Sequence, residues 1–457
     1  MREVAFVLPL FRPRITPRHR IPSGLLSLAA TMTGHERVRV EVMDAESAGW
    51  NAKQVGDYLA VRSPCAVGIS VCSPCLSASI ELVREIRSVL PDALILLGGK
   101  HISNCWQDAA AQFPDADVLV RGEGEQVTLM LARTLDANAS IDETKRALSE
   151  LPNVWTRGKP SPPIFPPSFD LYAAQPWPYE VLRPGLTSYL GDRMLIEYSR
   201  GCSGKCSYCL ASRDKKHVSF RPDTQVLDTL ESLSGRGFDS YFFTDDDFAF
   251  SPNQLRLLCE GILERGILIN FDANVRPDSL IRCSDIAGLL RKAGCRCLWL
   301  GIESGSPSML KSYRKGFQVD ICERAVAVAL SSAEIVRTNW IIGGPHETRA
   351  TVFESVRLAQ RLRCIGPHIP HISFMIPYPG TPIFEEALSL GLIDEKQHIR
   401  ADATHDHPTM PTKFLSMDEL MSLFTEFHET LFNVDFLAEV SSEVASEARL
   451  VMASAGM

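Results

Sequence analysis

Short apolar runs that favour β-strands alternate with amphipathic stretches along most of this chain. Between residues 194 and about 390, the strand-like runs are MLIEY, SYFFT, LINFDA, CLWLGI, IVRTNWII and HISFMI. Stretches with apolar residues three and four positions apart lie between them, at 222–235, 252–265, 319–333 and 348–363. This alternation is typical of βα units around a parallel sheet, so we predict an α/β fold here.

The amino-terminal part shows the same alternation. Residues 4–137 contain the strand-like runs VAFVLPL, VRVEVM, AVGIS, ALILLGG and DVLVRG. They predict a Rossmann-like, doubly wound parallel sheet, in which ligands bind beyond the carboxyl ends of the strands. The residues expected at those ends are small or polar: Asp44, Ser70, Ser73, Gly98, Gly99, Gly122, Glu123 and Gly124. No GxGxxG follows the first strand, which argues against a dinucleotide site.

Composition and charge exclude several classes of protein. The chain has 457 residues, of which 45% are apolar and 22% charged, and these values are ordinary for a globular protein. A formal net charge of −8 argues against nucleic-acid binding. No apolar run reaches the roughly 18 residues that span a bilayer, and the first strand-like run lacks the cleavage site of a secretory signal. We therefore expect a cytoplasmic protein without a membrane span.

Three of the 13 cysteines form a motif, and most of the others are expected in cores. Cys202, Cys206 and Cys209 make a CxxxCxxC run directly after a predicted strand. Three thiolates on one loop can hold three irons of a cubane cluster and leave the fourth iron open to a small molecule. The alternative is a structural zinc site completed by a histidine such as His217.

This motif, with the aromatic Tyr208 before its last cysteine, resembles the signature of the radical S-adenosylmethionine (SAM) enzymes. The resemblance implies a 4Fe-4S cluster whose open iron chelates the amino and carboxylate groups of SAM. One electron from the cluster would cleave SAM to a 5′-deoxyadenosyl radical. The resemblance also implies a partial (βα)6 barrel, with its site residues at the strand ends.

The resemblance assigns SAM contacts to six positions, which are Tyr208, Asp245, Asp246, Arg276, Glu303 and Glu347. Asp245 or Asp246 would contact the amino group, Arg276 the carboxylate, and Glu303 the ribose. Glu347 ends WIIGGPHE, which is similar to the family's GxIxGxxE but has Trp340 in place of the first glycine. Each carboxylate taken alone is more typical of a helix cap or an ion pair, and we expect one or two of Asp245–Asp247 to face water or cap the helix near Pro252.

The first part resembles the cobalamin-binding domain that precedes the radical domain in one subfamily, through VEVMDA, VGISVCSP, ILLGGKHIS and DADVLVRGEGE. The resemblance assigns cobalamin contacts to Asp44, Ser70, Ser73, Gly98, Gly99, His101, Gly122, Glu123 and Gly124. The cobalt-ligating DxHxxG motif is replaced by DAESAG, which implies cobalamin without a histidine on the cobalt. Cys72 and Cys75 form a CxxC, which we expect to pack beneath the corrin rather than act as a redox pair. For His101, a structural hydrogen bond is an equal alternative.

Four regions follow from these patterns. We predict a cobalamin-binding domain at 1–140, a connector at 141–190, a radical SAM barrel at 191–395 and a mainly helical region at 396–457. Eight prolines between residues 159 and 184 predict an extended connector. The amphipathic run after residue 415 predicts a helix that covers the barrel, and the residues after about 441 are expected to fray. His398, His405 and His407 are expected in a solvated loop.

We expect a methyltransferase that moves a methyl group from methylcobalamin to an unactivated carbon after hydrogen abstraction, with a second SAM remethylating the cobalt. A cyclase or ring-rearranging enzyme is the alternative, followed by a cobalamin-free radical enzyme or a sensor. A methylthiotransferase acting on transfer RNA would need three more cluster cysteines and a basic tail. The expected partners are a small-molecule or peptide substrate and an electron donor such as flavodoxin or ferredoxin. No catalytic acid or base is assigned, and the sequence does not identify the substrate.

Overall fold

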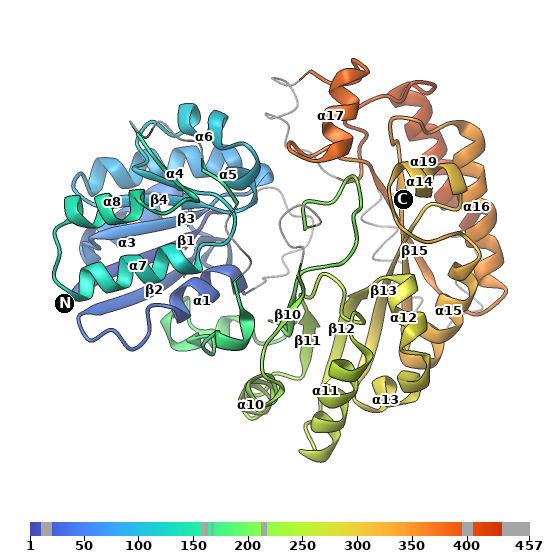
Figure 1. Cartoon of the computed structure of the whole chain (residues 1–457), viewed down its shortest axis with the longest axis horizontal. Helices are drawn as coiled ribbons and strands as arrows, with labels where there is room; N and C mark the ends of the chain where they lie inside the picture. Colours follow the sequence, from blue (N-terminus) through green and yellow to red (C-terminus); the bar gives the residue numbers. More distant parts are fainter. Residues whose placement is uncertain are drawn as a thin grey trace. The chain divides into compact units, whose positions relative to one another are not determined.

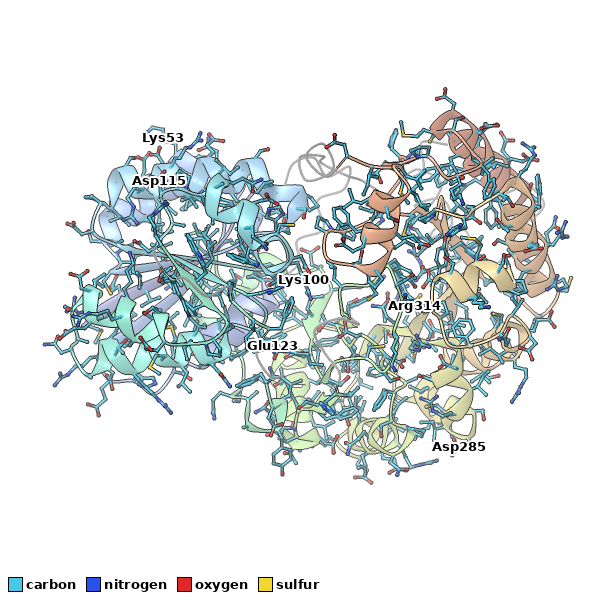
Figure 2. The ribbon with its side chains drawn as sticks, turned by 45° about the horizontal axis from the view of Figure 1, so that its top comes forward. Lys53, Lys100, Asp115, Glu123, Asp285 and Arg314 are labelled. Carbon is cyan, nitrogen blue, oxygen red and sulfur yellow. The ribbon has the colours of Figure 1, made fainter. Side chains whose placement is uncertain are left out.

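The computed structural model describes residues 1–10, 21–157, 159, 163–165, 169–211, 217–394 and 405–431. The chain forms two compact units, Met1–Leu195 and Ile196–Met457 (Figure 1). Exposed charged side chains such as Lys53 of the first unit and Asp285 of the second lie on outer surfaces (Figure 2). Among the described residues, no helix is both long and apolar enough to cross a membrane.

The first unit is built on a seven-stranded sheet in the order β6-β5-β4-β3-β1-β2-β7. Its strands are β1 (Arg2–Leu8), β2 (Val38–Asp44), β3 (Ala66–Ser70), β4 (Leu94–Gly98), β5 (Val118–Val120), β6 (Val154–Thr156) and β7 (Leu182–Arg183). All neighbouring strands are parallel except β5 and β6. The five strands predicted from the sequence are confirmed. The chain passes from β1 to β2 on one side and then to β3 on the other, so the topological switch point lies between β1 and β3.

Helices cover both faces of this sheet, which confirms the doubly wound arrangement. They are α1 (Ser23–Ala30), α2 (Ala45–Ala48), α3 (Ala52–Arg62), α4 (Leu76–Val89), α5 (Lys100–Asn104), α6 (Trp106–Gln112), α7 (Glu125–Asp136) and α8 (Ile141–Ser149). Ala5 and Val7 of β1 belong to the apolar core beneath α3 and α4. Because side chains alternate along a strand, Val4 and Phe6 face the other side, where α1 and α7 pack.

The range that we assigned to a connector contains more regular structure than its prolines suggested. Helix α8 follows a capping box formed by Ser140 and Glu143, and strands β6 and β7 extend the sheet at its two edges. Short 3₁₀ helices occur at η1 (Ser73–Cys75), η2 (Leu171–Ala173), η3 (Tyr179–Val181), η4 (Leu186–Tyr189) and η5 (Ser284–Ile286), three of them in this range. The strands here have only three and two residues, which is too short for a readable alternation.

The second unit contains a six-stranded sheet whose spatial order, β15-β14-β13-β12-β11-β8, follows the chain. Its strands are β8 (Met194–Ile196), β11 (Ser240–Phe243), β12 (Asn270–Val275), β13 (Cys295–Glu303), β14 (Ile335–Ile342) and β15 (Ile369–Phe374). They correspond to the six predicted strands. The register of β13 against β14 shifts between Gly301 and Glu303, and Glu303 has φ +70°. Beside this sheet, β9 (Ser199–Arg200) pairs antiparallel with β10 (Ser219–Phe220).

Helices connect these strands, as the periodicity predicted (Figure 1). They are α10 (Asp223–Ser234), α11 (Pro252–Glu264), α12 (Pro277–Arg282), α13 (Ala287–Lys292), α14 (Pro307–Ser312), α15 (Ile321–Ser332), α16 (Arg349–Arg363), α17 (Pro382–Ser389) and α19 (Met417–Leu431). Helix α19 contacts α16 and β15, with Phe374 stacked on Phe424 at 4.7 Å between ring centroids. The expectation of fraying after residue 441 lies outside the described residues.

Trp340, the departure from the family glycine, is a core residue. Its ring is 1% exposed and meets Phe427 of α19 at 5.9 Å, while Nε1 donates to the Thr338 hydroxyl at 2.9 Å. The large side chain therefore joins β14 to the carboxy-terminal helix.

Candidate functional site

The cysteine loop follows β8 and β9 and is fixed at its start by Asp245, which comes after β11. The Asp245 carboxylate accepts hydrogen bonds from the backbone N–H of Tyr198 at 3.2 Å and of Ser199 at 2.6 Å, and from the Ser199 hydroxyl. Burial raises the pKa of Asp245 to about 7. In this position Asp245 joins the ends of two neighbouring strands, which is a structural role that the sequence did not reveal.

The other two aspartates of the TDDDF run also hold backbone. Asp246 accepts from the N–H of Gly201 at 3.2 Å, so it supports the loop immediately before the first cysteine. Asp247 accepts from the N–H of Arg276 at 3.1 Å and from the Ser279 hydroxyl. Asp247 therefore caps α12 rather than the helix at Pro252, whose cap is Ser251. The predicted contact of Asp245 or Asp246 with the SAM amino group stays a prediction.

Two glycines allow the loop to pass close to its neighbours. Gly201 has φ +111°, and a Cβ there would lie 2.4 Å from the carbonyl oxygen of His217. A Cβ on Gly204 would lie 2.6 Å from Nη1 of Arg276. Any larger residue at either position would displace the loop or the arginine.

The three cysteines occupy the loop that these contacts define. Cys206 is buried, and Cys202 and Cys209 are partly exposed. Nη1 of Arg276 lies 3.6 Å from the sulfur of Cys206, and the N–H of Gly204 donates to the sulfur of Cys202 at 3.3 Å. Both contacts favour thiolates, so the donor set fits a three-cysteine cluster site. In the described part of the chain, no three His, Cys, Asp or Glu side chains converge as metal ligands, and this holds for the three cysteines as well as for a zinc site with His217. The fit to a cluster therefore rests on the donor types and their place on one loop.

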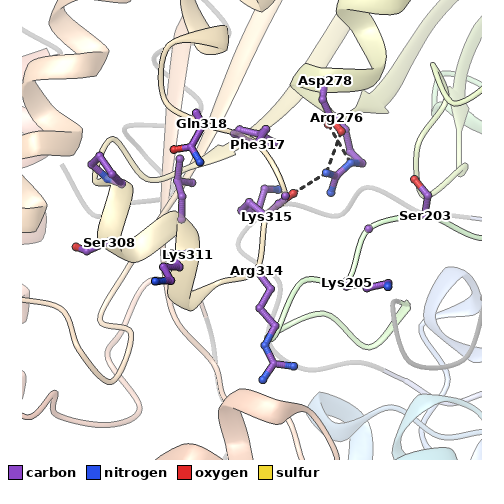
Figure 3. Close-up of a pocket in the computed structure, with 14 residues that line it drawn as sticks. Ser203, Lys205, Arg276, Asp278, Ser308, Lys311, Arg314, Lys315, Phe317 and Gln318 are labelled. Carbon is purple, nitrogen blue, oxygen red and sulfur yellow. Dashed lines mark hydrogen bonds and ion pairs between the residues drawn. The ribbon is translucent and has the colours of Figure 1, made fainter.

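A basic pocket opens beside this loop (Figure 3). It has a volume of about 840 Å³, and its lining includes the cations Lys205, Arg276, Lys311, Arg314 and Lys315. Figure 3 shows Arg276 bound to Asp278 and to the carbonyl oxygen of Lys315, which accepts from Nη2 at 2.7 Å. The guanidinium is thus held between the cysteine loop and the pocket, where an anionic group would meet it.

Glu303 belongs to a group of three polar side chains, of which Glu303 and Lys315 are buried and Tyr208 is half-buried. Nζ of Lys315 lies 3.2 Å from Oε1 of Glu303 and 3.4 Å from the hydroxyl of Tyr208. Burial, followed by the charge of Glu303, raises the pKa of Tyr208 well above its ordinary value. The structure therefore brings Tyr208 and Glu303 together around Lys315, and their predicted contacts with SAM stay predictions. Lys315 was missed, because nothing in SYRKGF distinguishes it from a surface lysine.

Glu347 is enclosed by donors from the chain itself. Its carboxylate accepts from the N–H of Gly343 at 3.2 Å, the Tyr313 hydroxyl at 3.3 Å and the Thr351 hydroxyl at 2.8 Å. Burial raises its pKa to about 7. The structure gives Glu347 the role of holding the turn after β14, and its predicted contact with SAM stays a prediction.

The first unit has a pocket of about 330 Å³ at the carboxyl ends of β1 and β3, which is the switch point of the sheet. Ser70, Glu46, Cys72 and Cys75 are among its lining residues, with the start of α1 on the other side. Of the predicted cobalamin residues, Ser70 lines this pocket. Doubly wound sheets bind ligands at such a position.

Other predicted cobalamin residues have structural partners. Asp44 is buried, caps α2 by accepting from the N–H of Ser47 at 3.0 Å, and accepts from the Tyr189 hydroxyl at 2.6 Å. Nδ1 of His101 lies 3.1 Å from the Ser73 hydroxyl, and burial lowers the pKa of this histidine. For His101 the structure shows the structural hydrogen bond that we named as the alternative.

The glycines after β4 and β5 make close contacts within the protein. Gly99 has φ +97°, and a Cβ there would lie 2.5 Å from the carbonyl oxygen of Val71; at Gly98 the nearest atom is 3.9 Å away. Gly122 donates its N–H to the Ser103 hydroxyl at 3.0 Å, and a Cβ on Gly124 would lie 3.1 Å from Leu28. The carboxylate of Glu123 accepts from the N–H of Phe169. The positive φ and the backbone contact account for the glycine at Gly99 without a ligand, whereas the neighbour of Gly124 is a leucine side chain that can move.

The carboxy-terminal histidines form no metal site among the described residues. His407 is exposed and lies 3.2 Å from Asp406, and the carbonyl oxygen of His405 accepts from the N–H of Phe374. His398 lies outside the described residues.

Two family descriptions match the chain: "B12 binding domain" over residues 20–132 and "Radical SAM superfamily" over residues 196–359. The two matches fall on the two units whose geometry is given above. The chain belongs to the radical SAM enzymes that carry a B12-binding domain. A radical SAM domain implies a 4Fe-4S cluster and SAM, and a B12-binding domain implies cobalamin.

Curated relatives include enzymes of more than one activity. An uncharacterized methyltransferase of Pyrococcus horikoshii is 25% identical over 90% of this chain and 87% of its own length. The anaerobic magnesium-protoporphyrin IX monomethyl ester cyclase of Cereibacter sphaeroides is 25% identical over 344 residues. The aligned part is 73% of this chain and 55% of that relative, so the chain spans about half of its length. The hopanoid C-3 methylase of Methylococcus capsulatus is 28% identical over 66% of this chain and 56% of its own length.

Solved structures share the fold. The radical SAM methyltransferase TsrM of Kitasatospora setae, solved with cobalamin and a [4Fe-4S] cluster, has a TM-score of 0.70 at 21% identity, covering 85% of this chain and 78% of that one. The cobalamin-dependent radical enzyme OxsB, with aqua-cobalamin and SAM, has a TM-score of 0.68 at 18% identity, covering 94% and 61%.

Proposed function

We propose that this chain is a cobalamin-dependent radical SAM methyltransferase acting on an unactivated carbon. The observation that carries the proposal is the occurrence, in one chain, of the CxxxCxxC loop beside Arg276 and of a B12-binding domain with a pocket at its switch point. When bound, the cluster and SAM supply a radical that removes a hydrogen atom, and cobalamin supplies a methyl group. The relatives that are methyltransferases support this proposal.

In this proposal the cysteine loop holds the cluster through Cys202, Cys206 and Cys209. Asp245 and Asp246 fix the start of the loop, because their carboxylates accept its backbone N–H groups. A loop fixed in this way loses little further conformational entropy when its ligand binds.

Arg276 has two roles in the proposal. Its charge offsets the negative charge of the cysteine thiolates, and its guanidinium binds the carboxylate of SAM from the side of the pocket. Tyr208, Glu303 and Lys315 form the neighbouring wall, where Glu303 accepts hydrogen bonds from the ribose hydroxyls and Lys315 holds the glutamate in position.

The first unit contributes the cobalamin site. We place it at the pocket lined by Ser70, with the residues predicted from the family motifs as its surroundings: Asp44, Ser73, Gly98, Gly99, His101, Gly122, Glu123 and Gly124. The partners in this proposal are a small-molecule or peptide substrate and an electron donor of the flavodoxin or ferredoxin kind.

The test is an anaerobic assay of the reconstituted full chain. Metal analysis should find about four irons, as a cubane cluster requires, and one cobalt per chain. Incubation with SAM, a reductant and panels of candidate substrates should yield 5′-deoxyadenosine and S-adenosylhomocysteine in equal amounts, because each turnover uses one SAM for the radical and one to remethylate the cobalt. A chain that binds iron but no cobalt, even with cobalamin supplied, would contradict the proposal.

A cyclisation is the second candidate, because three of the relatives are magnesium-protoporphyrin IX monomethyl ester cyclases. The same assay separates the two. A cyclisation requires no methyl donor, so it would form 5′-deoxyadenosine without S-adenosylhomocysteine. A non-catalytic sensor would form neither product.

A further inference from the structure

Cys72 and Cys75 lie together at the start of α4, on the wall of the pocket in the first unit. Their sulfur atoms are 2.7 Å apart, and both residues line the pocket. Cys72 is partly exposed and Cys75 is buried. From the sequence we expected this pair to pack beneath the corrin rather than to act as a redox pair. The direct contact of the two sulfurs beside an open pocket instead suggests thiol chemistry.

The surroundings shift the pKa values of the two thiols in opposite directions. The sulfur of Cys75 accepts from the N–H of Cys72 at 3.2 Å. It also lies 3.6 Å from the Ser79 hydroxyl, which donates to the carbonyl oxygen of Cys75 at 2.8 Å as well. Cys75 is also the residue that precedes α4, a helix of 14 residues whose amino-terminal dipole favours a negative charge. The hydrogen bond from the Cys72 side chain, together with these backbone and serine donors, lowers the pKa of Cys75. The same hydrogen bond, followed by burial, raises the pKa of Cys72. Cys75 is therefore the thiol that ionises first, and Cys72 is the one that keeps its proton to higher pH.

We propose that Cys72 and Cys75 form a redox-active dithiol that a low-molecular-weight disulfide such as oxidised glutathione converts reversibly to an intramolecular disulfide. The Cys75 thiolate attacks one sulfur of glutathione disulfide, forming a mixed disulfide and releasing a glutathione thiolate. The Cys72 thiol then loses its proton and attacks the Cys75 sulfur, which forms the internal bond and releases the second glutathione. Two electrons pass from the dithiol to glutathione disulfide. One of the two released glutathione thiolates takes up the proton lost by Cys72, and the other is protonated by solvent.

The pocket gives this chemistry a route and a consequence. This is also the pocket that we propose for cobalamin, so in the chain without cobalamin it provides access to Cys75, whose side chain is otherwise enclosed, for an incoming disulfide. Oxidation removes the thiolate charge from the pocket wall and fixes the turn between β3 and α4. The proposal does not depend on the reaction catalysed by the chain, since it concerns the two thiols alone.

The experiment is a glutathione titration of the full chain, first reduced and kept anaerobic, with no cofactor added. Free thiols are alkylated at each ratio of reduced to oxidised glutathione, and the digest is read by mass spectrometry. The peptide that contains Cys72 and Cys75 should lose two hydrogens at a single midpoint, while Cys65 and Cys364 form no internal disulfide with any partner. Full alkylation of both cysteines at the most oxidising ratio would overturn the proposal.

Three variants assign the roles. Cys72→Ser should accumulate one glutathione on Cys75, and Cys75→Ser should leave Cys72 mostly reduced. The reverse pattern would overturn the assignment of the nucleophile. In Ser79→Ala, the pH at which iodoacetamide labels Cys75 half-maximally should move upward, because a donor to the thiolate is lost, while labelling of Cys364 is unchanged. Far-ultraviolet circular dichroism verifies that each variant is folded.

Discussion

Nζ of Lys315 lies 3.2 Å from Oε1 of Glu303, and the two side chains are only 3% and 11% exposed. This is an ion pair removed from water, at the edge of a pocket that otherwise carries an excess of positive charge. The two charges of such a buried pair stabilise the fold mainly by neutralising each other, because either partner alone would be a buried charge without a counter-ion.

Replacement of Lys315 by Met should therefore destabilise the folded protein. The change leaves the Glu303 carboxylate buried without its partner, and we expect a loss of about 3 kcal/mol in the free energy of unfolding. Urea unfolding followed by circular dichroism measures it. Lys311→Met is the matched control, since Lys311 lines the same pocket but is exposed, and it should change stability by less than about 0.5 kcal/mol. Equal effects of the two changes would contradict the assigned ion pair.

Arg276→Gln should weaken SAM binding to the cluster-loaded chain. A charge-assisted hydrogen bond to the SAM carboxylate is worth about 2 kcal/mol, which corresponds to more than a tenfold rise in Kd. Equilibrium dialysis with labelled SAM gives this value directly. Arg314→Gln removes an exposed arginine of the same pocket and should leave Kd nearly unchanged, so a similar weakening in both variants would show that only general charge matters.

Gly204→Ala should reduce cluster assembly. The new Cβ would lie 2.6 Å from Nη1 of Arg276, so either the cysteine loop or the guanidinium must move. Iron and sulfide per chain after anaerobic reconstitution should fall to less than half of the wild-type amount. The control is Gly288→Ala in α13, where a Cβ meets no atom within 4 Å. Full iron loading of Gly204→Ala would show that the loop tolerates the displacement.

The stability of the chain should depend on pH through Asp245. Burial raises the pKa of Asp245 to about 7, whereas an unfolded aspartic acid titrates near 4. Between these values the folded protein retains a proton that the unfolded chain has lost, so stability falls as pH rises from about 4 to 7 and levels off above. Glu347 contributes in the same direction, because burial raises its pKa to about 7 as well.

Unfolding midpoints in urea between pH 4 and 8 check this dependence. Asp245→Asn removes one titrating group, so the stability of the wild type relative to this variant should decrease across the interval. Asp92→Asn, which changes an exposed residue, is the control: the difference in stability between the wild type and this variant should not change with pH. A wild-type advantage that grows from pH 4 to 7 would mean that Asp245 is ionised throughout.

The sequence predicted the strands well because their signal is local. Eleven predicted strands appear in the two sheets, and the cysteine loop follows the expected strand. The missed strands are β6, with three residues, and β7, β9 and β10, with two residues each, and tertiary pairing rather than pattern forms them.

The site was predicted less completely because its contacts join distant residues. Asp245 reaches Ser199 across 46 positions of the chain, and no periodicity reports such a partner. Lys315 has the same limitation: its burial depends on how the segment after α14 folds back onto β13. The close approach of Cys72 and Cys75 was visible as a spacing, but the direct contact of their sulfurs required the three-dimensional structure.

The register shift in β13 has a consequence for any attempt to redesign this barrel. A regular strand sends every second side chain to the same face, so its repeat alone would decide where a carboxylate points. Glu303 comes after the shift, with a positive φ that few non-glycine residues adopt, so its direction is set by an irregularity of the backbone. Restoring ideal pairing in that strand by deleting one residue would leave the glutamate in the sequence and remove it from its lysine.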